Sequence, residues 1–354
     1  MKLFTVGPVE MFPETLEVSS RQLPYFRTKE FSEVMLENER MFKESVRAPL
    51  SAKTVFLTTS GTGAMEAAII NCFTEKDHLL IINGGNFGKR FSQICDIHKI
   101  SYDEVHIPFG EDLKAEMLEE FNGKSYQALL VNIHETSTGK LYDINLLRNY
   151  CQKYGLYLVV DAISAYGADA IDFEQQDIDL LITSSHKALA LSPGISIVEI
   201  SEKIYRDRIL MIPAKTMYLD FKSHICNLER GQTPFTPAVG ILLELNQRLK
   251  SIQKYGMVNL QNEMREIALR FRKELHNRGF LIPSYTLSNA LTPILFASNA
   301  KDMYQHLKEE YGLVVTPSGG EYEDILLRVG HLGNLCWGDY EELLLAMEAI
   351  RGTK

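Results

Sequence analysis

Short apolar runs alternate with amphipathic segments over much of the chain. Runs rich in Val, Ile and Leu predict strands at residues 55–59, 78–82, 127–133, 156–161, 178–184 and 195–200. Helical spacing of apolar residues predicts helices at 32–46, 65–73 and 145–154. Strands that are apolar on both faces and separated by helices are typical of a parallel sheet that is covered on both sides. The pattern therefore predicts an α/β fold.

A loop rich in Pro and Thr at 228–237 interrupts this alternation. Beyond it, the pattern predicts helices at 238–249, 257–278, 301–311 and 340–351, and strands at 291–297 and 324–329. We therefore expect an N-terminal segment at 1–14, a large domain at 15–250 and a smaller α/β domain at 251–354.

The composition is that of an ordinary globular protein, with 354 residues, 45% hydrophobic and 23% charged. The formal net charge of −9 argues against a general nucleic-acid binder. No apolar run has membrane-spanning length, and the N-terminus lacks a signal-peptide pattern. The five cysteines show no CxxC spacing, which indicates reduced thiols, a cytoplasmic location and no metal site: Cys72, Cys95, Cys151, Cys226 and Cys336.

Two ionisable residues follow predicted strands and carry the first chemical signal. Lys187 comes after the strand at 178–184, and Asp161 ends the apolar run at 156–161. Burial lowers the pKa of a lysine, and only the neutral amine attacks a carbonyl. The carboxyl ends of parallel strands meet at one edge of a sheet, where ligands bind. A solvated surface lysine and a helix-capping aspartate are the alternatives.

Two further stretches suit the binding of anions. Ser60-Gly61-Thr62-Gly63-Ala64 lies between a strand and a helix, where free backbone N–H groups can bind a phosphate. Arg328 lies inside an apolar strand, and a guanidinium there is costly to bury unless it meets a carboxylate. A structural salt bridge is the competing interpretation for Arg328.

Together these motifs resemble the core of a class V aminotransferase. The resemblance rests on Asp161-Ala162-Ile163-Ser164 followed by Ser185-His186-Lys187-Ala188, and it extends from residues 6–9 to Arg328-Val329-Gly330. It implies pyridoxal 5′-phosphate (PLP) fold type I, with a mostly parallel seven-stranded sheet that includes one antiparallel strand. The similarity is closest to alanine/serine–glyoxylate/pyruvate and 2-aminoethylphosphonate–pyruvate transaminases. The resemblance implies that Lys187 holds PLP as an imine and that Asp161 keeps the pyridine nitrogen protonated.

The resemblance also assigns the remaining site residues. Arg328 would bind the substrate carboxylate, and the segment around Gly7 would lie beside the substrate. Thr233 and Thr236 would reach the active site of a partner subunit, which implies a homodimer. The other implied cofactor-binding residues are Thr62, Gly63 and Ala64 for the phosphate, Phe87 for stacking, Thr136 for the 3-oxygen, and Ser164 and His186 nearby.

The expected reaction is transamination between a small amino acid and pyruvate or glyoxylate. A 2-aminoethylphosphonate donor is the alternative within the same branch. A cysteine desulfurase or other PLP lyase would need a mobile reactive cysteine, and the nearest, Cys336, is expected to be a buried thiol. A nucleotide-binding α/β protein without PLP would use the turn at 60–63 but would leave Lys187, Asp161 and Arg328 unexplained.

Overall fold

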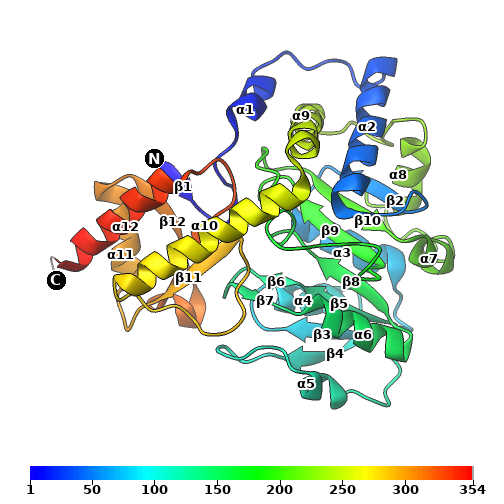
Figure 1. The fold of residues 1–354 in the computed structure, drawn as a ribbon. Coiled ribbons are helices and arrows are strands. Elements are labelled where there is room, and N and C mark those ends of the chain that lie inside the picture. Colours follow the sequence, from blue (N-terminus) through cyan, green and yellow to red (C-terminus); the bar gives the residue numbers. More distant parts are fainter. Residues whose placement is uncertain (353–354) are drawn as a thin grey trace.

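The computed structural model describes residues 1–352, which form two α/β domains (Figure 1). The large domain contains a seven-stranded sheet in the order β2-β10-β9-β8-β5-β3-β4. Strand β10 pairs antiparallel with β2 and β9, and the other neighbouring strands of this sheet pair in parallel. This confirms the mostly parallel sheet implied by the resemblance. Its strands are β2 (Lys53–Leu57), β3 (His78–Asn83), β4 (Ser101–His106), β5 (Ala128–Asn132), β8 (Tyr157–Asp161), β9 (Leu180–Ser184) and β10 (Ser196–Ile200).

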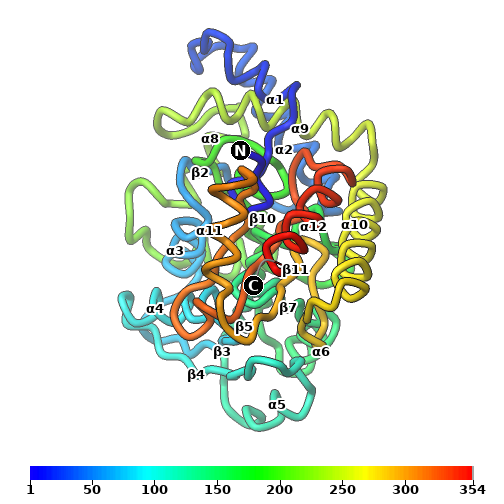
Figure 2. The backbone as a smooth tube through the Cα atoms, turned by 90° about the vertical axis from the view of Figure 1, so that its left-hand side faces the viewer, coloured from blue at the N-terminus to red at the C-terminus, as the bar shows by residue number. Residues whose placement is uncertain are grey.

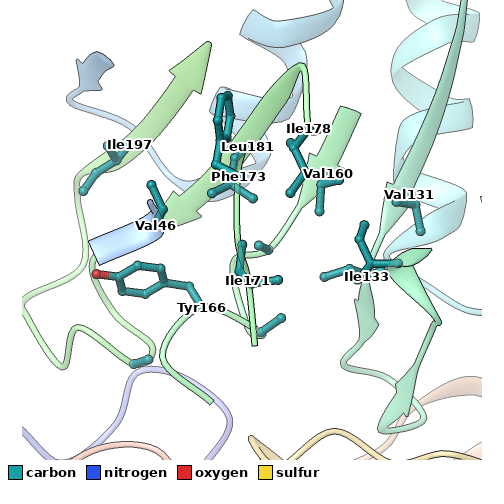
Figure 3. Close-up of a cluster of buried hydrophobic side chains, with 14 of the residues drawn as sticks. Val46, Val131, Ile133, Val160, Tyr166, Ile171, Phe173, Ile178, Leu181 and Ile197 are labelled. Carbon is teal, nitrogen blue, oxygen red and sulfur yellow. The ribbon is translucent and has the colours of Figure 1, made fainter. Parts of the chain in front are cut away.

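Helices cover both faces of this sheet, which is why its central strands are apolar throughout. One face packs against α2 (Lys29–Val46), α6 (Ile144–Tyr154) and α9 (Val239–Tyr255). The opposite face packs against α3 (Gly61–Cys72), α4 (Gly88–Ile97) and α8 (Phe221–Leu228). Figure 3 shows part of the first core, where Val160 and Leu181 of adjacent strands lie near Phe173 and Ile178. Shorter helices are α1 (Pro13–Ser19), α5 (Ala115–Glu119) and α7 (Glu202–Ile204), which a π-helical turn (Tyr205–Ile209) extends.

The second domain contains α10 (Met257–Asn277), which follows α9 directly after Gly256. Its four-stranded sheet has the order β1-β12-β13-β11, with β11 (Leu291–Leu295), β12 (Leu313–Pro317) and β13 (Leu326–Gly330). Helices α11 (Ala300–Glu310) and α12 (Trp337–Gly352) share its core with α10. A 3₁₀ turn (Gly320–Tyr322) precedes β13, and a hairpin of β6 (His134–Glu135) and β7 (Lys140–Leu141) belongs to the large domain. Figure 2 shows the chain from the side of this second domain.

The N-terminus joins the second domain, although it is farthest from it in sequence. Strand β1 (Lys2–Phe4) pairs in parallel with β12. Neither strand was predicted from the sequence, nor was β4 at the edge of the large sheet. The edge strand β4 reads Ser-Tyr-Asp-Glu-Val-His and is largely accessible to solvent on its free side, so it lacks the apolar run on which the other predictions depend.

Candidate active site

Lys187 and Asp161 lie together at the carboxyl edge of the large sheet. Asp161 is the last residue of β8, and its neighbour β9 ends at Ser184, three residues before Lys187. Both side chains are buried, with exposed fractions of 6% for Lys187 and 1% for Asp161. The topology therefore places an amine and a carboxylate where ligands of open α/β sheets bind.

Burial shifts the pKa values of both groups toward their neutral forms. Loss of solvation lowers the pKa of Lys187 to about 8, while the charge of Asp161 opposes the shift. Burial also raises the pKa of Asp161 to about 6, against the hydrogen bonds that the carboxylate accepts from Ile163 and Asn132. Within residues 1–352, the Lys187 amine forms no hydrogen bond or ion pair, so it is available as a nucleophile.

Asn132 holds the Asp161 carboxylate in place, a contact that the sequence did not reveal. Register pairs Asn132 of β5 with Asp161 of β8. The Asn132 amide donates to Asp161 Oδ2 at 2.7 Å, and the Ile163 N–H donates to Oδ1 at 2.8 Å. Both bonds favour the ionised carboxylate over the neutral acid. Only the pairing of β5 with β8 brings these two side chains together.

The predicted anion cradle is the turn that leads into α3. Thr62, Gly63 and Ala64 lie in the first turn of α3, where backbone N–H groups point along the helix axis. A Cβ atom on Gly63 would lie 2.0 Å from Oγ1 of Thr59, so a side chain there would push the turn away from the strand end. The cradle also has a cation from another element, because Arg90 Nη1 of α4 donates to Thr62 Oγ1 at 2.9 Å.

Phe87 stands beside Lys187 at the start of α4. The Lys187 Nζ lies 5.5 Å from the centre of the Phe87 ring, and the Arg90 guanidinium lies 4.7 Å from the same centre. Buried Glu135 fixes this turn, because its carboxylate accepts from the N–H groups of Phe87 at 3.1 Å and Gly88 at 2.9 Å. The contacts of Glu135 with this turn and of Arg90 with Thr62 were not predicted from the sequence.

Thr136, Ser164 and His186 were also predicted to bind the cofactor, and two contacts that involve hydroxyl groups lie in this region. The hydroxyls of Thr136 and Ser164 lie 2.7 Å apart. His186 Nδ1 lies 3.0 Å from the Ser184 hydroxyl, and burial lowers the pKa of His186 to about 4, which keeps the ring neutral. His134 of β6 lies beside them, and both of its ring nitrogens are buried without a hydrogen-bond partner among the described residues.

Arg328 reaches this cluster from β13 of the small domain. Its Nη1 donates to the Thr136 carbonyl at 3.0 Å, and Nη2 donates to the Pro317 carbonyl at 2.7 Å. Its Nε is buried without a partner, and burial lowers the pKa of the guanidinium to about 10. No carboxylate pairs with Arg328 within residues 1–352, which leaves the guanidinium able to receive the carboxylate of a ligand.

The N-terminal segment closes one side of the cluster at Gly7. This residue has φ +127°, and a Cβ atom there would lie 3.0 Å from Cγ of Lys187 and 3.1 Å from Cδ2 of His186. Glycine is therefore needed both for the backbone conformation and for the close approach to the lysine. The segment connects β1 of the small domain to the lysine of the large domain.

The predicted threonines of the 228–237 loop lie outside this cluster. Thr233 is buried, and its hydroxyl donates to the Phe235 carbonyl at 2.7 Å. Thr236 is exposed. Cys336, expected to be buried, is exposed as well, because the loop after β13 turns its side chain toward solvent before α12 begins.

The cluster fits PLP at each part of that molecule. The buried amine of Lys187 suits an aldehyde, Asp161 suits a pyridine nitrogen, and the α3 cradle with Arg90 suits a phosphate. The Phe87 ring, next to the Lys187 amine, suits the face of an aromatic ring. A buried lysine and a buried aspartate set at one sheet edge, with an anion cradle beside them, define the class of fold-type I PLP enzymes.

Comparisons with known proteins agree with this class. The aminotransferase class-V family model matches residues 19–328, and the chain belongs to that family. A Synechococcus protein named soluble hydrogenase, small subunit, is 25% identical over 360 residues, which cover 98% of this chain and 92% of that protein. Alanine–glyoxylate aminotransferase of Mus musculus is 27% identical over 343 residues, which cover 92% of this chain and 81% of that protein. Pyridoxamine–pyruvate aminotransferase from Mesorhizobium loti has the same fold, with a TM-score of 0.93 and 22% identity. The match covers 100% of this chain and 92% of that chain.

These findings confirm the family, the fold class and the PLP cofactor expected from the sequence motifs. The protein is therefore a PLP-dependent aminotransferase that acts on small molecules. None of the helices within residues 1–352 has the length and apolar character needed to cross a lipid bilayer.

Proposed function

We propose that this aminotransferase moves the amino group of a small amino acid, of the alanine or serine type, to pyruvate or glyoxylate. The observation that carries the proposal is the convergence of the Lys187 amine, the Asp161 carboxylate and the Arg328 guanidinium at one sheet edge. Similarity to a protein named alanine–glyoxylate aminotransferase supports a small donor and a small acceptor.

The three residues divide the chemistry among them. Bound PLP supplies an electron sink for the negative charge that develops at the substrate Cα. Asp161 would keep the pyridine nitrogen protonated, and Arg328 would bind the α-carboxylate through its planar fork. Lys187 would hold the cofactor covalently and, as a free amine, would accept the proton from Cα. Its lowered pKa supports this role, because a neutral amine is needed for both tasks.

The other predicted residues would position the cofactor and the substrate. The first turn of α3 with Thr62, Gly63 and Ala64 would bind the phosphate, and Arg90 would add a positive charge. Phe87 would stack on the pyridine ring. Thr136, Ser164 and His186 would contact the ring substituents, and the Gly7 segment would cover the substrate.

We also propose a homodimer whose partner loops complete the phosphate sites. The Thr236 side chain is exposed and forms no hydrogen bond within residues 1–352, whereas the Thr233 hydroxyl donates to the Phe235 carbonyl of its own loop. Apolar side chains surround the loop: Met217 is 80% exposed, and Tyr218 stacks on Phe235 with ring centres 5.3 Å apart. Such exposed apolar groups favour an interface. The scattered free cysteines support a cytoplasmic location.

Half-reactions on the purified enzyme test the proposed substrates. Alanine, serine, aspartate and 2-aminoethylphosphonate are added one at a time, and loss of the visible band of bound PLP is followed. We expect alanine or serine to convert the cofactor, and pyruvate or glyoxylate to restore the band. Conversion by 2-aminoethylphosphonate alone would replace the proposal with that donor, for which Arg328 would serve only the oxo acid.

Variants of two lysines separate the catalytic role from a general effect of charge. Lys187→Ala should abolish transamination and the borohydride-reducible attachment of PLP. The control is Lys250→Ala, which removes a half-exposed lysine that pairs with Glu37. The control should remain active, and normal turnover by Lys187→Ala would end the proposal. The Synechococcus relative is named as a hydrogenase subunit, and that name does not account for Lys187, Asp161 or Arg328.

A further inference from the structure

Arg248 of α9 is a buried cation without a hydrogen-bond partner. Its exposed fraction is 6%, and its Nε is fully buried and unpaired. Within residues 1–352, the guanidinium has no hydrogen bond or salt bridge, and its nearest described partner is the Phe12 ring, whose centre lies 3.9 Å away. Buried guanidinium groups are normally paired, because losing both water and an acceptor is costly. Arg248 is thus left with donors that a ligand could use.

A cavity of about 420 Å³ lies against this arginine. Its walls come from the segment containing Phe12, from α9, from the start of α10 and from the loop at 333–336. Helix α1 packs on α9, and α9 is followed by α10 after Gly256 (Figure 1). The volume suits a small metabolite, and the position is separate from the cluster around Lys187.

The cavity combines one cation, two acids and an apolar wall. Half-buried Glu14 lines it, and Glu263 accepts from the Tyr255 hydroxyl at 3.1 Å at its rim. Both carboxylates lie close enough to Arg248 to oppose the fall in its pKa that burial causes. Leu260 and Met264 of α10 supply apolar surface. Two carboxylates beside the guanidinium disfavour a dianion such as phosphate.

We propose that this cavity is a second ligand site, which binds a free α-amino acid with an apolar side chain. The α-carboxylate would meet the Arg248 guanidinium, the ammonium would meet Glu14, and the side chain would pack on Leu260 and Met264. The proposal depends on this cavity alone and stands whether or not the proposed substrates are correct. Since the loop at 333–336 follows the Arg328 strand, a bound amino acid contacts segments of both domains.

Calorimetry on the holoenzyme tests the site, with the cofactor first blocked by aminooxyacetate so that amino acids cannot react there. The probe is L-phenylalanine, compared with 3-phenylpropionate, which lacks the ammonium. We expect one L-phenylalanine per chain and an affinity at least tenfold lower for 3-phenylpropionate. Arg248→Met should weaken L-phenylalanine binding by about tenfold or more, and Arg248→Lys by less. Glu14→Gln should remove the preference for the amino acid over the acid.

Two controls make each outcome decisive. Arg148→Met removes an arginine from another cavity of about 430 Å³, and it should leave the affinity unchanged. Circular dichroism checks that each variant is folded, and Glu14→Gln, a change at a half-buried side chain, decides the case if Arg248→Met does not fold. The proposal is wrong if no binding is seen at about 10 mM L-phenylalanine. It is also wrong if Arg248→Met binds as wild type, or if 3-phenylpropionate binds as tightly as L-phenylalanine.

Discussion

At the scale of single residues, burial is the main influence on the charges of the candidate active site. It lowers the pKa of Lys187 to about 8 and of Arg328 to about 10, and it raises that of Asp161 to about 6. Each ionised group is then partly stabilised by an opposite charge nearby, Asp161 for the lysine and Glu135 for the arginine. The result is an amine that loses its proton near pH 8 and a carboxylate that is mostly ionised at neutral pH.

The pKa of Lys187 predicts how cofactor loading depends on pH. Only the neutral amine attacks the aldehyde, so the rate at which PLP-free enzyme takes up PLP should rise from about pH 7 and level off above about pH 9. Stopped-flow absorbance at the band of bound PLP measures this rate. A rate that keeps rising about tenfold per pH unit through pH 9 would show a lysine with its ordinary pKa of 10.5.

The hydrogen bond from Asn132 to Asp161 predicts a second residue effect. Asn132→Leu removes a donor to the ionised carboxylate, so the pKa of Asp161 should rise and the acid limb of kcat/KM should move to higher pH. The lost charge-assisted bond should also lower kcat by about tenfold or more, roughly 1.5 kcal/mol. A pH–rate profile is the measurement. An unchanged acid limb with a lower melting temperature would mean that Asn132 only supports packing.

At the scale of elements, the ends of neighbouring strands assemble the site. Register sets Asn132 at the end of β5 beside Asp161 at the end of β8, and β9 ends just before Lys187. The interiors of β3, β5 and β8 are apolar, whereas β10 contains a buried acid. Glu199 of β10 is fully buried opposite Thr54 of β2, whose hydroxyl donates to Oε2 at 2.7 Å, while Oε1 has no partner among the described residues.

The buried Glu199 predicts that the free energy of unfolding depends on pH. Burial raises its pKa to about 8, so the folded protein keeps a proton that the unfolded chain, with a pKa near 4.5, releases. Between pH 4.5 and about pH 8 the folded state binds more protons than the unfolded chain, so the titration of Glu199 lowers the free energy of unfolding as pH rises. Glu199→Gln removes the titration, so its stability relative to wild type should be greater at pH 8 than at pH 5. Urea midpoints at both values measure this, and a constant difference would contradict it.

At the scale of the molecule, the site lies where two domains meet. The large sheet supplies Lys187 and Asp161, the small domain supplies Arg328, and the first residues of the chain pass from β1 to Gly7 against the lysine. The α9–α10 junction at Gly256 connects the domains (Figure 1). The domain boundary near residue 250 and the homodimer remain predictions at this scale.

The homodimer proposal predicts that two inactive variants can complement each other. Lys187→Ala lacks the nucleophile, and Thr236→Glu sets a negative charge where the partner's phosphate would bind. Each mixed dimer should contain one intact site, so equal mixing with subunit exchange should restore about a quarter of wild-type activity. Native mass spectrometry verifies that mixed dimers form. Their presence without activity would show that the sites are not shared, and a fully active monomer would exclude the dimer requirement.

The sequence alone determined the central strands, the fold class and the residues that end those strands. Asp161 and Lys187 follow runs that are apolar on both faces, and such runs have a local signature because burial on two sides excludes polar residues. The motif around them also identified the family and the cofactor. Small shifts at element ends, such as α3 starting at Gly61 and not at residue 65, follow from the weak local signal of helix caps.

Only the tertiary structure decided which distant residues complete the site. Arg90 reaches Thr62 from the next helix, and Glu135 holds the Phe87 turn from a separate hairpin. Strand β1 pairs with β12 across nearly the whole chain, and the exposure of Cys336 depends on a loop. The sequence around a polar residue such as Arg90 or Glu135 looks the same whether its side chain faces solvent or contacts a partner in the fold. Their roles are therefore fixed by long-range packing, which the pattern of neighbouring residues does not encode.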